Sequence, residues 1–206
     1  RWIWSGDAYQ SYFVNRVLYM DKELCRRTIW ALRGKDPIEQ HINTILDYSL
    51  YWVMSVGDYY ETFGDADFVR QIWPRVKTMT DYCRASVNAD GFLEGRENDW
   101  TFIDWAEMDK EGALCAEQIL FIKALQTAAR CAELAGEDGR LYARQAEELR
   151  ARLDEFYFDE EKGCYIDGYA SGRRSVSPIS QLDTFFGLLQ IAQVSSKRSA
   201  IFFVPV

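Results

Sequence analysis

Two segments of the 206-residue chain combine carboxylates with tryptophans in the way that a carbohydrate site requires. In the first segment Trp4 precedes Asp7, and in the second Asp104 is followed directly by Trp105. The C–H faces of a sugar ring stack on aromatic rings, while its hydroxyls hydrogen-bond to acids. The second segment, residues 97–109, contains five acids, which repel one another unless a ligand, a cation or raised pKa values neutralise some of them. These residues therefore indicate a sugar-binding cleft.

Each of these residues also has a purely structural interpretation. A carboxylate such as Asp7 at the start of a helix is stabilised by the helix N-terminus, an effect of about 0.5–2 kcal/mol. Tryptophans such as Trp4 and Trp105 are typical of an aromatic-rich core, which the 15% aromatic content would also explain. The acids of residues 97–109 would equally suit a solvated loop. Taken alone, the local sequence leaves both interpretations open.

Several other kinds of site are disfavoured by the composition. His41 is the single histidine and no G-x-S-x-G segment accompanies it, so a Ser-His-Asp device has little support. The five cysteines are widely spaced and lack C-x-x-C pairs, which argues against zinc and against a disulfide framework. The net charge is −8 and no phosphate-binding glycine motif is present. We therefore expect no metal, no cofactor and no nucleic-acid partner, and no stretch is apolar enough to span a membrane.

The periodicity of apolar residues predicts a mostly helical chain. A short helical turn over residues 65–71 and a new helix from Trp73-Pro74 are expected, because proline is tolerated at the start of a helix. Residues 90–109 are predicted to be non-helical, and residues 159–169 to form a turn with a short extended piece. The other predicted helices cover residues 7–20, 22–32, 44–63, 110–134, 140–156 and 178–194.

Helices that are apolar nearly all round alternate with sharply amphipathic ones, as in residues 44–63 and 140–156. This alternation predicts an all-α toroid of helical hairpins, with inner helices covered on both sides and outer helices half exposed. A solenoid is less favoured because no fixed repeat is present. The chain begins at Arg1 rather than Met and ends on an apolar stretch, residues 200–206. We therefore expect residues 1–206 to form part of a single toroid domain, a partial barrel within a longer protein.

The pattern Arg1-x-x-Trp4-x-Gly6-Asp7-Ala8, followed far downstream by Phe102-Ile103-Asp104-Trp105, resembles the catalytic domain of the bacterial α-L-rhamnosidase family. The resemblance implies a toroid of six helical hairpins and inverting hydrolysis of terminal α-L-rhamnosides. It implies that Asp7 is a catalytic-site carboxylate contacting the sugar and that Trp4 is the aromatic wall beside it. Asp104 and Trp105 would form the rim of the same pocket and bind substrate.

The same resemblance places the two catalytic carboxyl groups outside this chain. In the family the general acid directly precedes the residue that matches Arg1, and the general base lies in the other half of the toroid. We therefore expect the remaining part of the parent chain to be a partner, and this fragment to lack turnover by itself.

Two alternatives to a rhamnosidase stay open at this point. Another toroid glycosidase acting on a different sugar would have the same acids and tryptophans. A non-catalytic helical scaffold would spread Trp4, Asp7, Asp104 and Trp105 over unrelated surfaces, whereas an enzyme would gather them on one concave face. The compartment, whether cytoplasmic or periplasmic and secreted, is left open by the sequence.

Overall fold

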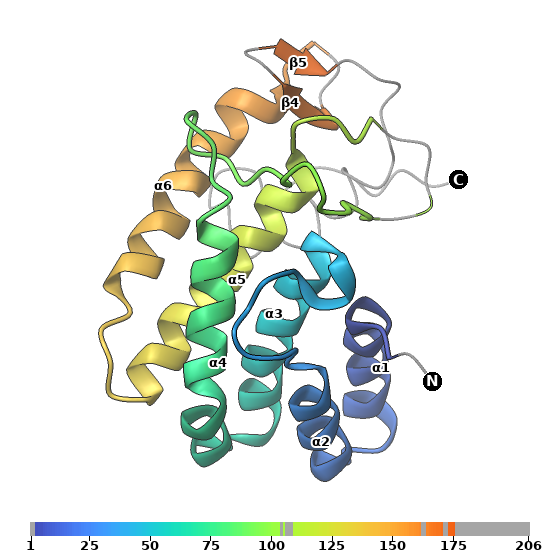
Figure 1. The fold of residues 1–206 in the computed structure, drawn as a ribbon, viewed down its shortest axis with the longest axis vertical. Coiled ribbons are helices and arrows are strands. Elements are labelled where there is room, and N and C mark those ends of the chain that lie inside the picture. The colour runs from blue at the N-terminus through green and yellow to red at the C-terminus, as the bar shows by residue number, and fades with distance from the viewer. Residues whose placement is uncertain (1–2, 104, 106–108, 162–163, 171–172, 176–206) are drawn as a thin grey trace.

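The computed structural model describes residues 3–103, 105, 109–161, 164–170 and 173–175, and its elements are drawn in Figure 1. The described residues form six α-helices, one short 3-10 helix and five very short strands. The helices are α1 (Ser5–Leu18), α2 (Lys22–Leu32), η1 (Ile42–Thr44), α3 (Leu46–Phe63), α4 (Ala66–Arg84), α5 (Cys115–Leu134) and α6 (Arg140–Tyr157). The strands are β1 (Ala113–Leu114), β2 (Phe158–Asp159), β3 (Cys164–Tyr165), β4 (Gly168–Ala170) and β5 (Arg173–Ser175).

Consecutive helices form three antiparallel hairpins, α1 with α2, α3 with α4 and α5 with α6 (Figure 1). Helix α3 packs against both α1 and α5, so these three helices make one layer, and α2, α4 and α6 lie outside it. Helices α3 and α5 are buried along most of their length, whereas α4 and α6 bury one face only. This is the alternation of enclosed and half-exposed helices that the sequence predicts.

Three helix boundaries are fixed by capping residues. Asp21 precedes α2, and its side chain accepts a hydrogen bond from the Leu24 N–H at 2.9 Å. Asp65 does the same for α4 through the Phe68 N–H at 3.1 Å. Helix α3 ends at Gly64, whose φ of +64° is easily adopted only by glycine. The predicted bounds 22–32, 44–63 and 140–156 lie within two residues of the observed bounds of α2, α3 and α6.

The prediction of a helix break before Pro74 is wrong. Helix α4 runs without interruption from Ala66 to Arg84, with Pro74 in its interior. The ring of Pro74 lies on the solvent side, while one apolar stripe continues past it and packs against α3 and α5. The burial of this stripe offsets the cost of an interior proline, about 3 kcal/mol. The buried apolar members of the stripe are Phe68, Val69, Ile72, Trp73, Val76, Met79 and Cys83.

The predicted start of the fifth helix at Lys110 is also wrong by five residues. Gly112 has a φ of +74°, and Ala113 and Leu114 are extended and pair with Tyr169 and Gly168 of β4. Helix α5 begins only at Cys115, after this pairing has removed the preceding residues from the helix. The end of the region predicted as a turn with a short extended piece, residues 159–169, thus pairs with β1, whereas Cys164 and Tyr165 pair with β2. The predicted helix over 178–194 lies outside the described residues.

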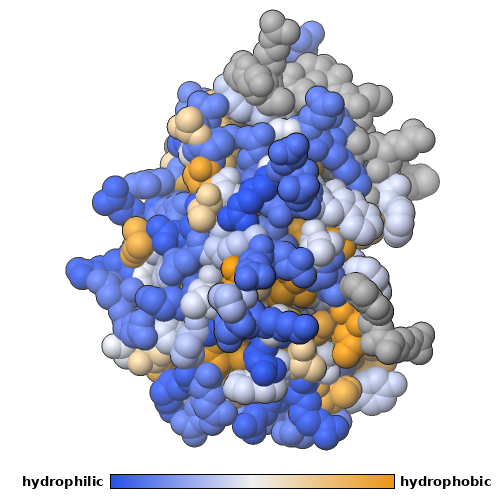
Figure 2. Space-filling view, in the orientation of Figure 1, coloured by the Kyte–Doolittle hydropathy of each residue, from blue (hydrophilic) through white to orange (hydrophobic). Residues whose placement is uncertain are grey.

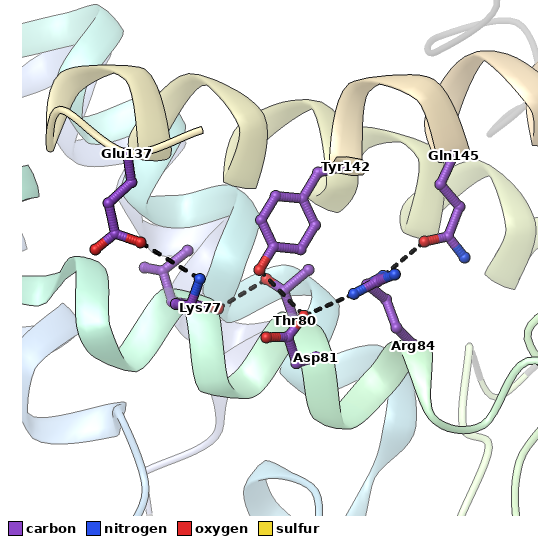
Figure 3. A network of polar contacts seen from close by, with 8 residues as sticks. Lys77, Thr80, Asp81, Arg84, Glu137, Tyr142 and Gln145 are labelled. Carbon is purple, nitrogen blue, oxygen red and sulfur yellow. Dashed lines mark hydrogen bonds and ion pairs between the residues drawn. The ribbon is translucent and has the colours of Figure 1, made fainter. Parts of the chain in front are cut away.

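Polar contacts join the two outer helices α4 and α6 (Figure 3). The Tyr142 hydroxyl donates to Asp81 Oδ1 at 3.1 Å, and Arg84 Nε donates to Gln145 Oε1 at 2.7 Å. At the end of this row Lys77 Nζ contacts Glu137 Oε2 at 3.3 Å. These contacts fix the register between two hairpins.

One apolar stripe lies on the surface. The sequence predicts a helix with an apolar stripe over residues 7–20, and α1 is that helix, but the stripe faces solvent. Its side chains are between 47% and 68% exposed; they belong to Phe13, Val14, Val17 and Leu18. Figure 2 shows hydrophobic residues at the surface on the side where α1 lies. Within the described part of the chain, no helix is both long and apolar enough to cross a bilayer.

Candidate functional site

A pocket of about 590 Å³ lies where the first turns of α1 and α3 meet the loop that follows residue 97. This volume is in the range typical of small-molecule sites. The lining is mainly aromatic, with one carboxylate. Its residues are Trp4, Gly6, Asp7, Gln10, Ile45, Tyr48, Tyr51, Trp100, Phe102, Ile103 and Trp105.

The start of α1 is fixed to the start of α3 by the side chain of Asn43. Asn43 Nδ2 donates to the Ile3 carbonyl at 3.0 Å, and its Oδ1 accepts from the Ser5 N–H at 3.2 Å. Directly after Ser5, Gly6 lies against the Tyr48 ring, and a Cβ at Gly6 would come within 2.6 Å of that ring. The glycine of the Trp-x-Gly-Asp-Ala motif is therefore needed for helix contact, and it places Asp7 beside Tyr48.

Asp7 is the one carboxylate among the lining residues that the structure describes. The Tyr48 hydroxyl donates to Asp7 Oδ2 at 3.4 Å. Burial, and then the charge of Asp7, raise the pKa of Tyr48 to about 12, so the phenol remains a donor at neutral pH. Trp4 meets Tyr48 edge to face, with ring centroids 6.2 Å apart. The remaining acceptor positions of the Asp7 carboxylate are available to hydroxyl groups in the pocket.

The opposite wall consists of three aromatic rings on the loop after residue 97. Phe102 packs edge to face against Trp100 at 5.6 Å and against Trp105 at 5.1 Å, and it also contacts Tyr48 at 6.0 Å. The exposed fractions of Trp100 and Trp105 are 46% and 83%. Exposed tryptophans supported from behind by other rings are typical of surfaces that stack on ligands.

The loop is attached to the beginning of α3 by backbone pairing. The Trp100 N–H donates to the Thr44 carbonyl at 3.1 Å, and the Leu46 N–H donates to the Trp100 carbonyl at 3.0 Å. Asp47, which is fully buried, accepts from the Phe102 N–H at 3.0 Å. The first turn of α3 thus positions both walls of the pocket.

Behind the loop, the only histidine lies between a serine and an aspartate. His41 Nδ1 is 3.0 Å from Ser49 Oγ, and its Nε2 is 3.4 Å from Asp99 Oδ2. Burial lowers the pKa of His41 to about 4, although the charge of Asp99 opposes this shift. Ser49 is fully buried, so no substrate can reach its hydroxyl. This Ser-His-Asp arrangement is therefore structural, and it holds the residue that precedes Trp100.

A family model described as the bacterial α-L-rhamnosidase six-hairpin glycosidase domain matches residues 26–195. The chain belongs to this family. It is accordingly a rhamnosidase-type glycosidase domain, and its three hairpins form part of the all-α toroid that the sequence predicts. The match begins at Arg26, so the Trp4–Ala8 segment lies outside it.

Two solved rhamnosidase structures are similar to this chain. A GH78 family rhamnosidase of Bacillus sp. GL1 is similar with a TM-score of 0.80 and 24% sequence identity, covering 95% of this chain and 22% of that chain. A rhamnosidase from Klebsiella oxytoca with rhamnose bound gives a TM-score of 0.73 and 23% identity, covering 94% of this chain and 39% of that chain. The chain therefore spans well under half of these structures. No curated protein matches it.

In the rhamnosidase-family chain, three of the four predicted site residues line one pocket. Trp4 and Asp7 lie on one side of it and Trp105 on the other, whereas Asp104 lies outside the described residues. The sequence motif includes Phe102 without giving it a role in the site, and no role was predicted for Trp100 or Tyr48. Tyr48 lies among the apolar residues of an enclosed helix, so its pattern gave no signal of a pocket. Among the described residues, no group of three or more His, Cys, Asp or Glu side chains could hold a metal ion.

Proposed function

We propose that the pocket binds a terminal α-L-rhamnosyl residue and forms part of the sugar-binding face of an inverting α-L-rhamnosidase. The observation that supports this proposal best is that Asp7 and the rings of Trp4 and Trp105 line the same pocket. Membership of the rhamnosidase family supplies the substrate class. The family likeness alone also fits a toroid glycosidase for another sugar, so the experiments below compare sugars.

The chemistry of the lining suits a 6-deoxy sugar. Asp7 would accept hydrogen bonds from ring hydroxyls, and a charged acceptor makes such bonds stronger than neutral ones. The C–H face of the sugar would stack on the exposed tryptophans of the two walls. The methyl group of rhamnose would contact an aromatic surface at no desolvation cost, whereas a hydroxymethyl group would lose hydration there.

Inversion requires a carboxylic acid that protonates the leaving oxygen and a carboxylate that activates water from the opposite face. These two groups stand roughly 6.5–9.5 Å apart in inverting glycosidases. We propose that both belong to parts of the parent protein outside residues 1–206, as the family resemblance implies. In this division the present chain binds and orients the sugar, and Asp7 contacts it as a catalytic-site residue.

Binding of free sugars to the 206-residue chain tests the site. We expect calorimetric titration to give tighter binding of L-rhamnose than of L-mannose, which differs only by the 6-hydroxyl, and no binding of D-glucose. Asp7→Asn should weaken L-rhamnose binding by about tenfold, because it removes the charged acceptor. Ser11→Ala, on the same helix but outside the pocket lining, is the matched control and should bind like the unmodified chain. Equal affinity for all three sugars would contradict the proposed specificity.

Hydrolysis of chromogenic glycosides tests the proposed mechanism. We expect no turnover of an α-L-rhamnoside by the 206-residue chain, and selective release from the rhamnoside by a longer protein that contains this chain. In that longer protein Asp7→Asn and Asp104→Asn should lower kcat/KM with little loss of stability. Turnover by the 206-residue chain would contradict the location given to the acid and base, and preference for another glycoside would change the substrate.

A further inference from the structure

Phe102 lies in the centre of the aromatic wall, and its backbone N–H, its carbonyl and its ring each contact a charged side chain. Its N–H donates to Asp47 Oδ1 at 3.0 Å, and its carbonyl accepts from Lys110 Nζ at 2.6 Å. The same ammonium lies 5.5 Å from the centroid of the Phe102 ring. An acid from α3 and a base from the residues before β1 therefore fix one residue of the pocket from opposite sides.

Burial of the Asp47 carboxylate costs free energy, because the charged group loses its hydration. Its side chain is fully buried, and Oδ2 has no hydrogen-bond partner within the described residues. Glu117 of α5 is buried as well, and its burial, followed by the charges of Asp47 and Asp99, raises the pKa of Glu117. Lys110 is the cation that offsets part of the penalty of burying Asp47. Carboxylates retained in such places are commonly functional rather than stabilising.

The position of Asp47 in the chain links the two walls of the pocket. It directly precedes Tyr48, whose hydroxyl contacts Asp7 and whose ring packs on Phe102 at 6.0 Å. The residue before it, Leu46, is hydrogen-bonded to Trp100. A movement of the Asp47 side chain would therefore displace Phe102, and with it the neighbouring rings of Trp100 and Trp105.

We propose that Asp47 and Lys110 are positioning residues that clamp Phe102 and so hold the tryptophan wall in the geometry that stacks on the sugar. This proposal rests on the proposed function of the pocket. In it, Asp47 acts as a hydrogen-bond acceptor and neither residue touches the substrate.

The test compares variants that keep or remove the acceptor. Asp47→Asn retains an oxygen for the Phe102 N–H, whereas Asp47→Ala does not. By NMR, we expect amide hydrogen exchange at Phe102 to be slow in the unmodified chain and in Asp47→Asn, and about tenfold faster in Asp47→Ala. Affinity for L-rhamnose should follow the same order, with Asp47→Asn within about threefold of the unmodified chain. Equal exchange at Phe102 in Asp47→Asn and Asp47→Ala would overturn the proposal.

Two further variants separate positioning from general loosening of the fold. Glu117→Ala removes a carboxylate that is buried to a similar degree but does not contact Phe102, and it should leave Phe102 exchange unchanged. Lys110→Met removes the donor to the Phe102 carbonyl from a half-buried position, and it should weaken L-rhamnose binding without unfolding the chain. If Asp47→Ala does not fold, Asp47→Ser replaces it, since the shorter side chain cannot reach the Phe102 N–H. Equal effects of Asp47→Ala and Glu117→Ala would contradict the clamp.

The outcome distinguishes this proposal from the proposed function. If the unmodified chain does not bind L-rhamnose, the proposed function is contradicted, while exchange at Phe102 still decides whether Asp47 and Lys110 hold this residue. If L-rhamnose binds, but neither Asp47→Ala nor Lys110→Met changes the amide exchange of Phe102 or the affinity for L-rhamnose, the proposed function is supported and the clamp is overturned.

Discussion

Gly6 shows how tightly a single residue limits the site. A methyl group at this position would lie 2.6 Å from the Tyr48 ring, which is far inside van der Waals contact. In an ordinary helix Gly→Ala stabilises a protein by about 0.5–1 kcal/mol. Here we expect Gly6→Ala to lower the free energy of unfolding by about 1–3 kcal/mol, as overpacking does. Urea denaturation measures the change, and a gain in stability would show that α1 and α3 do not meet this closely.

Two buried titratable residues near the pocket oppose each other in their effect on stability. Burial lowers the pKa of His41 to about 4, so between pH 6.5 and 4 His41 is protonated in the unfolded chain and neutral in the folded chain. Stability from this residue is therefore lost as the pH falls from 6.5 to 4. Burial raises the pKa of Asp47 to about 6, so the folded chain keeps a proton that the unfolded chain has released above pH 3.8. Stability from Asp47 is lost as the pH rises from 3.8 to 6.

Substitution of either residue should remove that residue's own contribution to the pH dependence of stability. Relative to the unmodified chain, His41→Gln should gain stability as the pH falls from 6.5 to 4, and Asp47→Asn should gain stability as the pH rises from 3.8 to 6. Each change should amount to about 3 kcal/mol over its window. Urea unfolding at a series of pH values measures both, and curves that stay parallel to that of the unmodified chain would be inconsistent with these shifts.

At the residue scale, sequence predicted those parts of the pocket that form a local pattern. Trp4, Asp7 and Trp105 stand in short motifs with acids beside tryptophans, and all three line the pocket. Tyr48 could not be found in this way, and the role of Phe102 within its motif could not be predicted, because both reach the site only when α3 meets the loop. The role of Asp47 was hidden for the same reason, since the sequence of α3 does not show which distant residue an acid in it will contact.

At the element scale, α4 contains the clearest conflict between local preference and packing. Pro74 interrupts no helix here, yet it cannot donate to the carbonyl of the preceding turn. Because its ring is exposed, Pro74→Ala should restore the missing hydrogen bond without disturbing the core. We expect the free energy of unfolding to rise by about 1–2 kcal/mol, since the restored helix preference exceeds the entropy that proline removes from the unfolded chain. Thermal denaturation provides the measurement, and a lower Tm would mean that Pro74 is favoured where it stands.

Helix bounds were predictable wherever capping residues and apolar periodicity agree, as at Asp21 and Gly64. Helix bounds were not predictable where pairing with a distant segment sets the start of a helix. Residues 110–114 have acceptable helical sequence, but Ala113 and Leu114 pair with β4 more than 50 positions later, and this pairing delays α5. Local sequence has no information about such a partner.

At the scale of the whole molecule, the sequence predicts the hairpins and the apolar stripe of α1, but it does not predict that this stripe is exposed to solvent. Large exposed apolar patches promote association. We expect the 206-residue chain to self-associate as its concentration rises, and the double substitution Val17→Lys with Leu18→Lys to reduce this tendency while leaving helicity intact. Sedimentation velocity over a concentration series measures the effect. Identical concentration dependence in both proteins would place the associating surface elsewhere.

The pocket has walls from three stretches of chain that are distant in sequence. Asn43 reaches back 40 positions to Ile3, Tyr48 reaches back 41 to Asp7, and Phe102 reaches 55 positions back to Asp47. Each hairpin contains mostly local contacts, which form early in folding, whereas these long-range contacts require the closure of large loops. We therefore expect the pocket to assemble after the hairpins, so that a molecule can lose its pocket while keeping its helices.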